Sequence, residues 1–487
     1  MRFEKILDNI GYKLINGNLT TEIKDVVYDS RKANKDTVFV ALIGVNADGH
    51  NFIKSAYEQG CRNIIVCKKI EVLEDMNIVE VMNTRQALGF IAANFFEHPE
   101  EKLFKIGLTG TKGKTTSSYM IKSVFEKAGY KIGVIGTMGV VFADKYYETK
   151  NTTPESYDVY KYFREMVDEG CTHVVMEVSS LALKHGRVNG IVFDYAIFTN
   201  LTPDHIGEQE HKDFNEYKYC KSLLFEQCKK AIINADDEHY SNMVANKKHT
   251  IFVGMNDIAQ IKLENITYIN RKGQVGTSFI INDYKKGNKF EVFLDMPGKF
   301  NVYNALNVIA LALEEKIDNA KIIETFKEFK VLGRLEPVNV SNDFSVLIDY
   351  AHNGISMQSI IETMKSYPHK RIISLFGCGG ERSKTRRVEM GEISGNLADF
   401  SIITEDNSRS EPFDNIVKDI LEGTSKTNGK YVIIEDRAKA INYCLDNAKK
   451  GDIILLLGKG HETYMEKNGE RFHFDEWEVF NNWLAKK

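Results

Sequence analysis

Cysteine is scarce in this sequence, and its pattern excludes two kinds of cross-linked protein. The seven cysteines are scattered, none forms a CxxC pair, and their number is odd. A disulfide framework and a zinc ribbon both need regularly spaced cysteines, so the pattern argues against both. It is typical of a protein in a reducing compartment, and we therefore expect a cytoplasmic protein.

Long apolar runs are also absent. The longest, IILLL at 453–457, is far shorter than the roughly 20 residues that span a bilayer. The first residues, MRFEKILDNIGYKLI, mix charged with apolar side chains, unlike the apolar centre of a signal peptide. We expect no membrane insertion, and we read the short apolar run as a buried strand.

The chain has no surplus of charge of one sign. Its 64 basic and 68 acidic residues leave a formal net charge of -4. No bulk basic field is available to recruit nucleic acid, so no nucleic-acid partner is expected. Acidic substrates must then be held by local sites.

Proline is rare, with only seven residues, so each one helps to mark a boundary. The chain of 487 residues is long enough for about three domains. Strand-like TVFVALIG at 37–44 and helix-like NFIKSAYEQG at 51–60 predict a small α/β domain over residues 1–99, which ends near Pro99.

Two further α/β domains are expected. Strand-like FKIGLT at 104–109 and helix-like TTSSYMIKSVFEKAGY at 115–130 begin an alternation typical of a doubly wound, mostly parallel sheet, assigned to residues 100–331. A boundary near VLGRLEP at 331–337 opens a third, Rossmann-like domain over residues 332–487.

The clearest local motif is GLTGTKGKTT at 107–116, between a predicted strand and a predicted helix. Glycine allows backbone N–H groups to approach phosphate oxygens, and the helix N-terminus adds its positive dipole end. Lys114 is placed to reach the β- and γ-phosphates, and the Thr115 hydroxyl to bind Mg²⁺. The strict GxxxxGK[ST] pattern would have its first glycine at 108, which is Leu108 here, so this is a variant phosphate loop.

With these motifs in order, the chain resembles the Mur ligase family, and within it the members that add the third peptide residue. The matching strings are DSR at 29–31, GVNADGH at 44–50, TGTKGKTT at 109–116, NTTPES at 151–156, MEVSS at 176–180, NLTPDH at 200–205, YKYCKSLLF at 217–225, FNVYNALN at 300–307, GRLEP at 333–337, IDYAHN at 348–353, GCGGERSKTRR at 377–387, DNSRSE at 406–411 and GKGHETY at 458–464.

The resemblance implies an ATP-dependent ligation in peptidoglycan synthesis. ATP phosphorylates the carboxylate of UDP-N-acetylmuramoyl-L-alanyl-D-glutamate, and the amine of a diamino acid attacks the acyl phosphate. Such chemistry needs charge neutralisation more than a protein nucleophile. The implied nucleotide-binding residues are Gly110, Thr111, Lys112, Gly113, Lys114, Thr115, Thr116, Asn304, Arg334 and Asp349. Because Arg334 lies at the linker to the third domain, we expect it to meet ATP when the domains close.

The implied metal and catalytic residues include an unusual lysine. Glu177 and His205 match family ligands of Mg²⁺, alongside Thr115. Lys221 matches a lysine that CO₂ converts to a carbamate, which changes a cation into an anion able to help hold Mg²⁺. Tyr217 lies one helical turn before Lys221, so the two are expected to share a face.

The resemblance also implies two substrate sites. The uridine-diphosphate and muropeptide contacts would be Ser30, Val45, Asn46, Ala47, Asn151, Thr152, Thr153, Ser179, His185 and Arg187; the amino-acid contacts would be Arg382, Asp406, Asn407, Ser408, Arg409, Gly458 and Glu462. Guanidinium and hydroxyl groups suit diphosphate and carboxylate recognition.

Two departures leave the identity of the amino acid open. The family motif DNPR of diaminopimelate-adding members reads DNSR here, so Ser408 removes a fixed φ and frees Asn407. The stretch DHIGEQEHKDF at 204–214 is longer than in those members and is closer to lysine-adding ones. Since Arg409 is retained near the chemistry and, with Arg382, can grip a second carboxylate, we favour meso-diaminopimelate over L-lysine.

Two alternatives remain. A folylpolyglutamate synthetase shares the phosphate loop but lacks the N-terminal domain indicated here by DSR and GVNADG. A non-catalytic nucleotide-binding regulator of the same fold would be expected to lose Lys114, Glu177, His205 or Lys221, and all four are present. We therefore expect a monomeric ligase with ATP and Mg²⁺.

Overall fold

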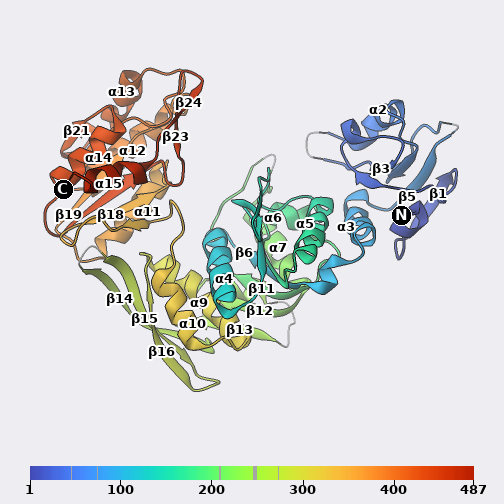
Figure 1. Ribbon diagram of the computed structural model, residues 1–487, viewed down its shortest axis with the longest axis horizontal. Helices are drawn as coiled ribbons and strands as arrows, with labels where there is room; N and C mark the ends of the chain where they lie inside the picture. The colour runs from blue at the N-terminus through green and yellow to red at the C-terminus, as the bar shows by residue number, and fades with distance from the viewer. Residues whose placement is uncertain (45–46, 74, 208–209, 245–248, 272–273, 487) are drawn as a thin grey trace. The chain divides into compact units, whose positions relative to one another are not determined.

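The computed structural model describes residues 1–44, 47–73, 75–207, 210–244, 249–271 and 274–486. The chain forms two compact units, residues 1–262 with 304–321 and residues 263–303 with 322–487 (Figure 1). Both units contain mostly parallel sheets with helices between many of their strands, which confirms the α/β class.

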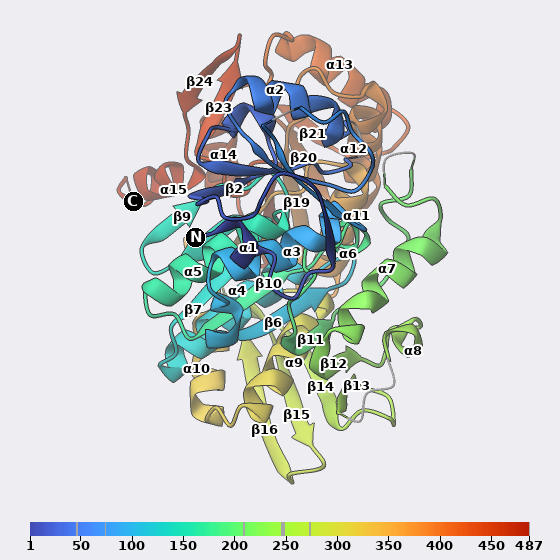
Figure 2. The same ribbon diagram turned by 90° about the vertical axis from the view of Figure 1, so that its right-hand side faces the viewer.

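The first unit begins with a five-stranded sheet in the order β1-β5-β4-β3-β2, parallel except for β1. Val38 and Val40 of β3 pack with α1 and α3, whereas Phe39 packs with α2, so helices cover both faces (Figure 2). This is the pattern of a buried parallel sheet. The elements are α1 (Phe3–Ile6), β1 (Tyr12–Asn16), β2 (Asp25–Val27), β3 (Thr37–Val40), α2 (Ile53–Glu58), β4 (Asn63–Val66), β5 (Asn77–Val81) and α3 (Thr84–Phe95), with 3₁₀ turns at Ser30–Lys32, Gly49–Phe52 and Pro99–Lys102.

A second sheet forms the centre of this unit, in the order β13-β12-β11-β6-β10-β7-β8-β9. Strand β6 pairs in parallel with β10 and β11; β7 continues the parallel part beyond β10, β12 and β13 continue it beyond β11, and β8 and β9 extend the β7 edge in antiparallel fashion. The strands are β6 (Phe104–Thr109), β7 (Ile132–Gly136), β8 (Gly139–Phe142), β9 (Lys145–Tyr147), β10 (His173–Glu177), β11 (Phe193–Phe198), β12 (Cys228–Asn234) and β13 (Thr250–Gly254).

The helices of this unit follow its strands. They are α4 (Lys114–Ala128), α5 (Ser156–Asp168), α6 (Ser180–Lys184), α7 (Phe214–Glu226) and α8 (Tyr240–Met243), and parts of α9 (Lys299–Glu314) and α10 (Asn319–Glu328) also belong to it. Helix α4 ends two residues before the predicted end because Gly129 takes φ +99°. Parallel pairing sets Glu177 beside Leu108, so the ends of β10 and β6 meet at one edge of the sheet.

His173, at the opposite end of β10, gives a pH prediction for stability. Its ring lies among Phe104, Phe125 and Tyr130, and burial lowers its pKa to about 4. A histidine with a depressed pKa contributes stability above its unfolded value of about 6.5, and that contribution is lost as pH falls towards 4. His173→Phe is therefore expected to lose less thermal stability than the wild type between pH 7 and pH 4.5, measured by thermal denaturation; an equal loss would contradict this account.

The second unit contains three long strands and a six-stranded sheet. The long strands are β14 (Ile261–Arg271), β15 (Gln274–Asp283) and β16 (Asn288–Leu294), and the last two form an antiparallel pair. The six-stranded sheet has the order β17-β18-β22-β19-β20-β21 and is parallel except for β17. Its strands are β17 (Glu336–Val338), β18 (Ser345–Asp349), β19 (Arg371–Phe376), β20 (Phe400–Ile403), β21 (Tyr431–Ile433) and β22 (Asp452–Leu457).

Helices cover both faces of the six-stranded sheet. One core joins it to α11, α12 and α13, and another joins it to α14 and α15. Their bounds, with those of a small hairpin, are α11 (Gly354–Lys365), α12 (Lys384–Leu397), α13 (Phe413–Thr424), α14 (Arg437–Asp446), β23 (Tyr464–Lys467), β24 (Glu470–His473) and α15 (Glu476–Leu484). No helix in the described part of the chain is long and apolar enough to cross a membrane.

Candidate functional site

The phosphate loop joins β6 to α4 in the predicted context. Gly110 and Gly113 have φ values of +152° and +86°. A Cβ at Gly110 would lie 1.9 Å from Thr199 Oγ1, and one at Gly113 would lie 2.2 Å from Asn304 Oδ1. Both positions therefore require glycine, and the buried Asn304 side chain lies against the loop as predicted for a nucleotide-binding residue.

Two lysines meet at one carbonyl of this loop. Lys114 Nζ donates to the Gly110 oxygen at 2.8 Å, and Lys221 Nζ donates to the same oxygen at 2.8 Å. Lys221 is 2% exposed, and burial, followed by repulsion from Lys114, holds its pKa well below the usual value. Burial also lowers the pKa of Lys114, which Glu177 opposes. Burial thus disfavours the charged form of both amines, and an anion bound at the loop would favour it.

The rest of the loop packs against the NLTPDH segment and α7. The Thr111 hydroxyl is 3.1 Å from the Tyr217 hydroxyl, and the Lys221 ammonium lies 4.6 Å from the centre of the Tyr217 ring. Tyr217 and Lys221 thus share a face of α7, as predicted. Lys112 points to solvent and pairs with Asp204 at 3.2 Å, and Thr116 is half-buried on the first turn of α4.

Glu177 is the buried carboxylate of the site, at 1% exposure. It accepts hydrogen bonds from Thr115 Oγ1 at 3.0 Å, Thr137 Oγ1 at 3.1 Å and the Thr137 N–H at 3.1 Å. Burial raises its pKa, and the Lys114 charge opposes the rise. Thr137 was not among the residues singled out in the sequence; its signal is a hydroxyl directly after β7, the strand beside β10.

The donor set around Glu177 fits Mg²⁺. A buried carboxylate with hydroxyl neighbours on the first turn of a helix offers the hard oxygen ligands that this cation prefers. A further predicted metal ligand, His205, has an exposed ring whose Nδ1 lies 2.7 Å from Glu210 Oε1 and whose centre lies 6.1 Å from the Tyr217 ring centre. Its backbone φ is +53°, in the left-handed region.

Several predicted muropeptide residues gather beside Glu177. Thr152 Oγ1 is 3.0 Å from Thr137 Oγ1, and the buried Thr153 hydroxyl donates to the Glu177 carbonyl at 2.9 Å and to Ser179 Oγ at 3.3 Å. Ser179 caps α6 by accepting from the Ala182 N–H. Of the other predicted contacts on this segment, Asn151 is exposed and His185 is half-buried.

Glu155 holds the predicted muropeptide residue Arg187 in place. Its Oε1 accepts from Arg187 Nε at 3.0 Å, while Arg187 Nη1 donates to the Thr153 carbonyl at 3.1 Å. Arg85 of α3 also donates to Glu155, at 3.2 Å, and its Nε donates to the Ile43 carbonyl at 2.6 Å. One arginine therefore links the Ile43 carbonyl to the carboxylate that orients Arg187.

Glu155→Gln is expected to weaken acceptor binding. An amide loses the charge of both arginine pairs, and hydrogen bonds to charged groups contribute about 1.5–3 kcal/mol, so the KM for the UDP-linked acceptor should rise roughly tenfold or more. Steady-state kinetics with saturating co-substrates measures the change. Glu165→Gln, on the same helix α5, is the matched control, and equal KM values in the two variants would contradict the role of Glu155.

The predicted uridine-diphosphate residues lie in the five-stranded domain. Ser30 is buried in the 3₁₀ turn after β2, and its carbonyl accepts from Gln59 Nε2 at 2.8 Å. The Ala47 carbonyl accepts from the Gly44 N–H at 2.8 Å. Val45 and Asn46 lie outside the described residues.

Arg334 and Asp349 belong to the second unit. Asp349 accepts from the Leu335 and Ala351 N–H groups, each at 2.8 Å, and burial raises its pKa to about 6. The exposed Arg334 guanidinium lies 5.8 Å from the Tyr350 ring centre. Both side chains thus lie beside residues 350–351, which follow β18 and belong to the IDYAHN motif.

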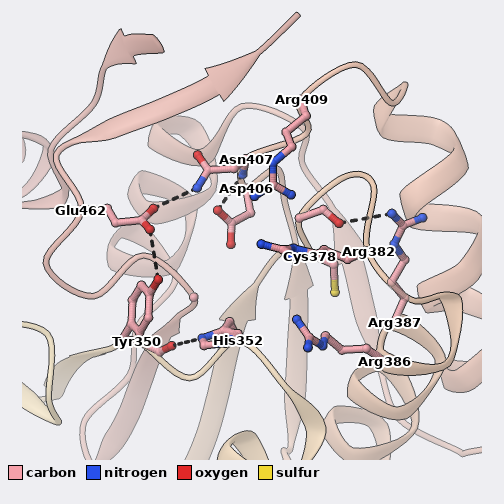
Figure 3. A pocket seen from close by; sticks show the side chains of 12 residues that line it. Tyr350, His352, Cys378, Arg382, Arg386, Arg387, Asp406, Asn407, Arg409 and Glu462 are labelled. Carbon is pink, nitrogen blue, oxygen red and sulfur yellow. Dashed lines mark hydrogen bonds between the residues drawn. The ribbon is translucent and has the colours of Figure 1, made fainter. Parts of the chain in front are cut away.

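A pocket of about 240 Å³ opens at the carboxyl end of the six-stranded sheet (Figure 3). Six of the seven predicted amino-acid contacts line it. The lining residues are Tyr350, His352, Cys378, Gly379, Arg382, Arg386, Arg387, Asp406, Asn407, Arg409, Gly458 and Glu462. The seventh, Ser408, is 2% exposed and does not line the pocket; its carbonyl packs against Gly380, where a Cβ would lie 1.8 Å from it.

Opposite charges stand on opposite sides of this pocket. Figure 3 shows Asp406 and Glu462 on one side and Arg382 and Arg386 on the other, with Arg409 reaching in between them. Within the described part of the chain, neither Arg382 nor Arg386 has a carboxylate partner, and Arg382 is exposed. The pocket can therefore hold a molecule with an ammonium group and a carboxylate.

The other two arginines have protein partners. Arg387 is held by Glu411, through Nη1 at 2.6 Å, and by Asp419 at 3.0 Å, so its charge is already matched. Arg409 Nη1 donates to the Gly380 carbonyl at 2.6 Å, and its Nε is 3.6 Å from Glu466 Oε2. Arg409 has φ +52°, a conformation that a non-glycine residue adopts at some cost and that directs its side chain into the pocket.

Family models match three successive parts of the chain. They are described as Mur ligase family, catalytic domain, at residues 22–96; Mur ligase middle domain, at 108–312; and Mur ligase, glutamate ligase domain, at 333–460. These segments agree with the predicted order of three α/β domains.

Curated relatives and a solved structure match over the full length. A UDP-N-acetylmuramoyl-L-alanyl-D-glutamate--2,6-diaminopimelate ligase of Clostridium acetobutylicum is 42% identical over 100% of both chains, and one of Clostridium perfringens is 39% identical over 100% of both. A solved structure with the same ligase name has a TM-score of 0.78 and 25% identity, and it covers 100% of this chain and 99% of its own. The phosphate loop, the charged pocket and these matches together show that the chain belongs to the Mur ligase family.

Proposed function

We propose that this chain is the ATP-dependent ligase that joins meso-diaminopimelate to UDP-N-acetylmuramoyl-L-alanyl-D-glutamate, a step of peptidoglycan synthesis. The observation that carries the amino-acid assignment is the pocket with carboxylates on one side and unpaired guanidinium groups on the other. The relatives that share the whole length of the chain are named as ligases of this acceptor and of 2,6-diaminopimelate.

The reaction proceeds in two balanced steps. The acceptor carboxylate attacks the γ-phosphorus of ATP, ADP leaves, and an acyl phosphate forms. The neutral amine of the amino acid then attacks the acyl carbon, the C–O bond to phosphate breaks, and an amide, inorganic phosphate and a proton are released. Both steps develop charge on phosphate oxygens, so Lys114 and the N–H groups of the phosphate loop are the residues expected to stabilise it.

Mg²⁺ would be held by Glu177 and Thr115, with His205 and the carbamate of Lys221 as further ligands. When bound, the cation neutralises the charge of the phosphate oxygens and orients them. Burial keeps Glu177 out of water, and the Thr137 hydroxyl and N–H orient its carboxylate. His205 contacts Glu210 through Nδ1 at 2.7 Å, which orients the ring and leaves Nε2 as the nitrogen that would bind the cation.

A carbamate at Lys221 is part of this proposal. Only a neutral amine adds CO₂, and burial of Lys221 favours its neutral form. A carbamate would carry a negative charge beside the Lys114 ammonium, which suits that ammonium better than a second cation does. The lowered pKa and the Lys114 neighbour therefore both support this modification.

We also propose a cytoplasmic location for this reaction. All seven cysteines are free thiols, none of them in a disulfide, as in proteins of reducing compartments.

Phosphate release tests the proposed function. The purified protein receives ATP, Mg²⁺ and the UDP-linked acceptor, with meso-diaminopimelate, L-lysine, L-ornithine or no amino acid. Release that requires both the acceptor and diaminopimelate supports the proposal. Release only with L-lysine keeps the reaction but overturns the amino-acid assignment, and release with a folate acceptor, or none at all, overturns the reaction.

A further inference from the structure

A lysine stands directly behind the charged pocket without lining it. Lys459 is 0% exposed and lies between Gly458 and Gly460, both with positive φ. A Cβ at Gly458 would lie 2.8 Å from Asp406 Oδ2, and one at Gly460 would lie 2.6 Å from the Tyr350 Cβ. The backbone around Lys459 is therefore packed tightly against two residues that line the pocket.

The Lys459 ammonium contacts four oxygen atoms. Its Nζ donates to Asn407 Oδ1 at 2.7 Å, to the Tyr464 carbonyl at 2.5 Å and to Glu462 Oε2 at 3.2 Å, and it is 3.5 Å from Asp406 Oδ1. A buried ammonium is costly unless it is paired and hydrogen-bonded, and here every one of its three protons has an acceptor. Three of these four contacts are side chains that line the pocket.

These contacts fix the orientation of the Asn407 amide. Because Oδ1 accepts from Lys459 and from the Glu466 N–H at 2.9 Å, Nδ2 must face the opposite way. Asn407 Nδ2 then donates to Glu462 Oε2 at 2.9 Å, while Glu462 Oε1 accepts from the Tyr350 hydroxyl at 3.2 Å (Figure 3). Lys459 and Asn407 hold the same carboxylate oxygen, so the position of Glu462 depends on both.

We infer that Lys459 is a positioning residue for the incoming amino acid. It acts through Asn407 and Glu462, which it holds in the one orientation that presents the carboxylate to the ammonium end of the substrate. This inference rests on the proposed function of the pocket and adds a residue that does not itself touch the substrate. It also explains why a cation is buried beside Asp406 and Glu462: without it, two carboxylates would repel each other behind the pocket.

The test compares how one substitution changes the KM for each of the three substrates. Lys459→Met keeps the length of the side chain but removes its charge and its three donors. The KM for meso-diaminopimelate is expected to rise about 10- to 100-fold, the usual cost of losing the partner that orients a binding group, while the KM values for ATP and the acceptor change less than about twofold. Lys467→Met, on the neighbouring hairpin with a 46% exposed side chain, is the matched control and should leave all three KM values unchanged.

A purely structural role gives a different result. Loss of folded protein lowers the apparent kcat with every substrate but leaves KM unchanged, so an unchanged KM for diaminopimelate, or an equal rise in all three, overturns the inference. Lys459→Gln retains donors for Asn407 and Tyr464 and should give an intermediate KM; it carries the test if the methionine variant does not fold. If the wild type uses L-lysine, the proposed amino acid is wrong, and the role of Lys459 is then tested by the KM for L-lysine. If the wild type turns over no amino acid, both the proposed function and the role of Lys459 are wrong.

Discussion

Lys221→Ala is expected to lower ATP-dependent turnover by about 10²–10³-fold, the range found when one preorganised charge-stabilising group is removed. Lys221 is 2% exposed and donates to the carbonyl of Gly110 in the phosphate loop, so its loss acts directly at the phosphates. As a carbamate it would supply an anionic oxygen ligand that alanine lacks. Phosphate release under saturating substrates measures the loss.

Two controls separate the carbamate from a simple loss of packing. Lys218→Ala, on the same helix α7, removes a lysine whose ammonium lies 5.8 Å from the Phe214 ring centre and should retain wild-type turnover. Formate or acetate added to Lys221→Ala should restore part of the activity, because a small carboxylate can occupy the space left behind. Depletion of CO₂ should slow the wild type and leave the alanine variant unaffected; a wild type insensitive to CO₂ would contradict the carbamate.

Arg409→Met is expected to lower kcat/KM for meso-diaminopimelate by about 10²-fold or more, with a much smaller effect on any turnover with L-lysine. Lysine has no second carboxylate, so only diaminopimelate loses a charge-assisted contact with the guanidinium, and a site built for a polar group discriminates strongly against its absence. The left-handed backbone of Arg409 is equally costly for methionine, so the substitution changes the head group and not the strain.

The measurement is the ratio of kcat/KM values for the two amino acids. Arg471→Met, an exposed arginine whose guanidinium lies 4.4 Å from the Tyr464 ring centre, is the control for loss of a nearby positive charge. If Arg409→Met and Arg471→Met give the same ratio, Arg409 does not select the second carboxylate.

The sequence predicted correctly those parts of the site that lie at or directly after the ends of strands. Glycine spacing between a strand and a helix predicted the phosphate loop, and the structure has the helix beginning at Lys114. Glu177, predicted at the end of a buried strand, lies at the end of β10 beside Thr115. Parallel strands bring their carboxyl ends to one edge, so local patterns carry this information.

The residues that hold other side chains could not be predicted in the same way. Thr137 contacts Glu177, 40 residues away; Glu155 contacts Arg187, 32 residues away; and Lys459 contacts Asn407, 52 residues away. Arg386 is identified by its place in the lining of the pocket. Such pairings depend on tertiary packing, which no short motif encodes. The antiparallel strands β8, β9, β15 and β16 were likewise not located by the sequence, which predicted only that the sheet over residues 100–331 is mostly parallel.

The consequence of having Ser408 in place of the family proline could not be predicted from the motif alone. Loss of the proline frees Asn407 and Ser408 in the sequence, but in the structure Asn407 is fixed by Lys459 and Glu466. Arg409 still lines the pocket, and Ser408 is buried beneath it against Gly380. Contacts from Lys459, which follows β22, and from Glu466 of β23 therefore replace the constraint that proline supplies in the family motif.

The most direct measurement is the mass of the product formed from an equimolar mixture of meso-diaminopimelate and L-lysine, with ATP, Mg²⁺ and UDP-N-acetylmuramoyl-L-alanyl-D-glutamate. We predict that the UDP-linked tripeptide carries diaminopimelate, because the Arg382 and Arg409 guanidinium groups line the pocket and can bind its second carboxylate. A product that carries lysine, or an acceptor that gains no amino acid while ATP remains intact, would contradict this account.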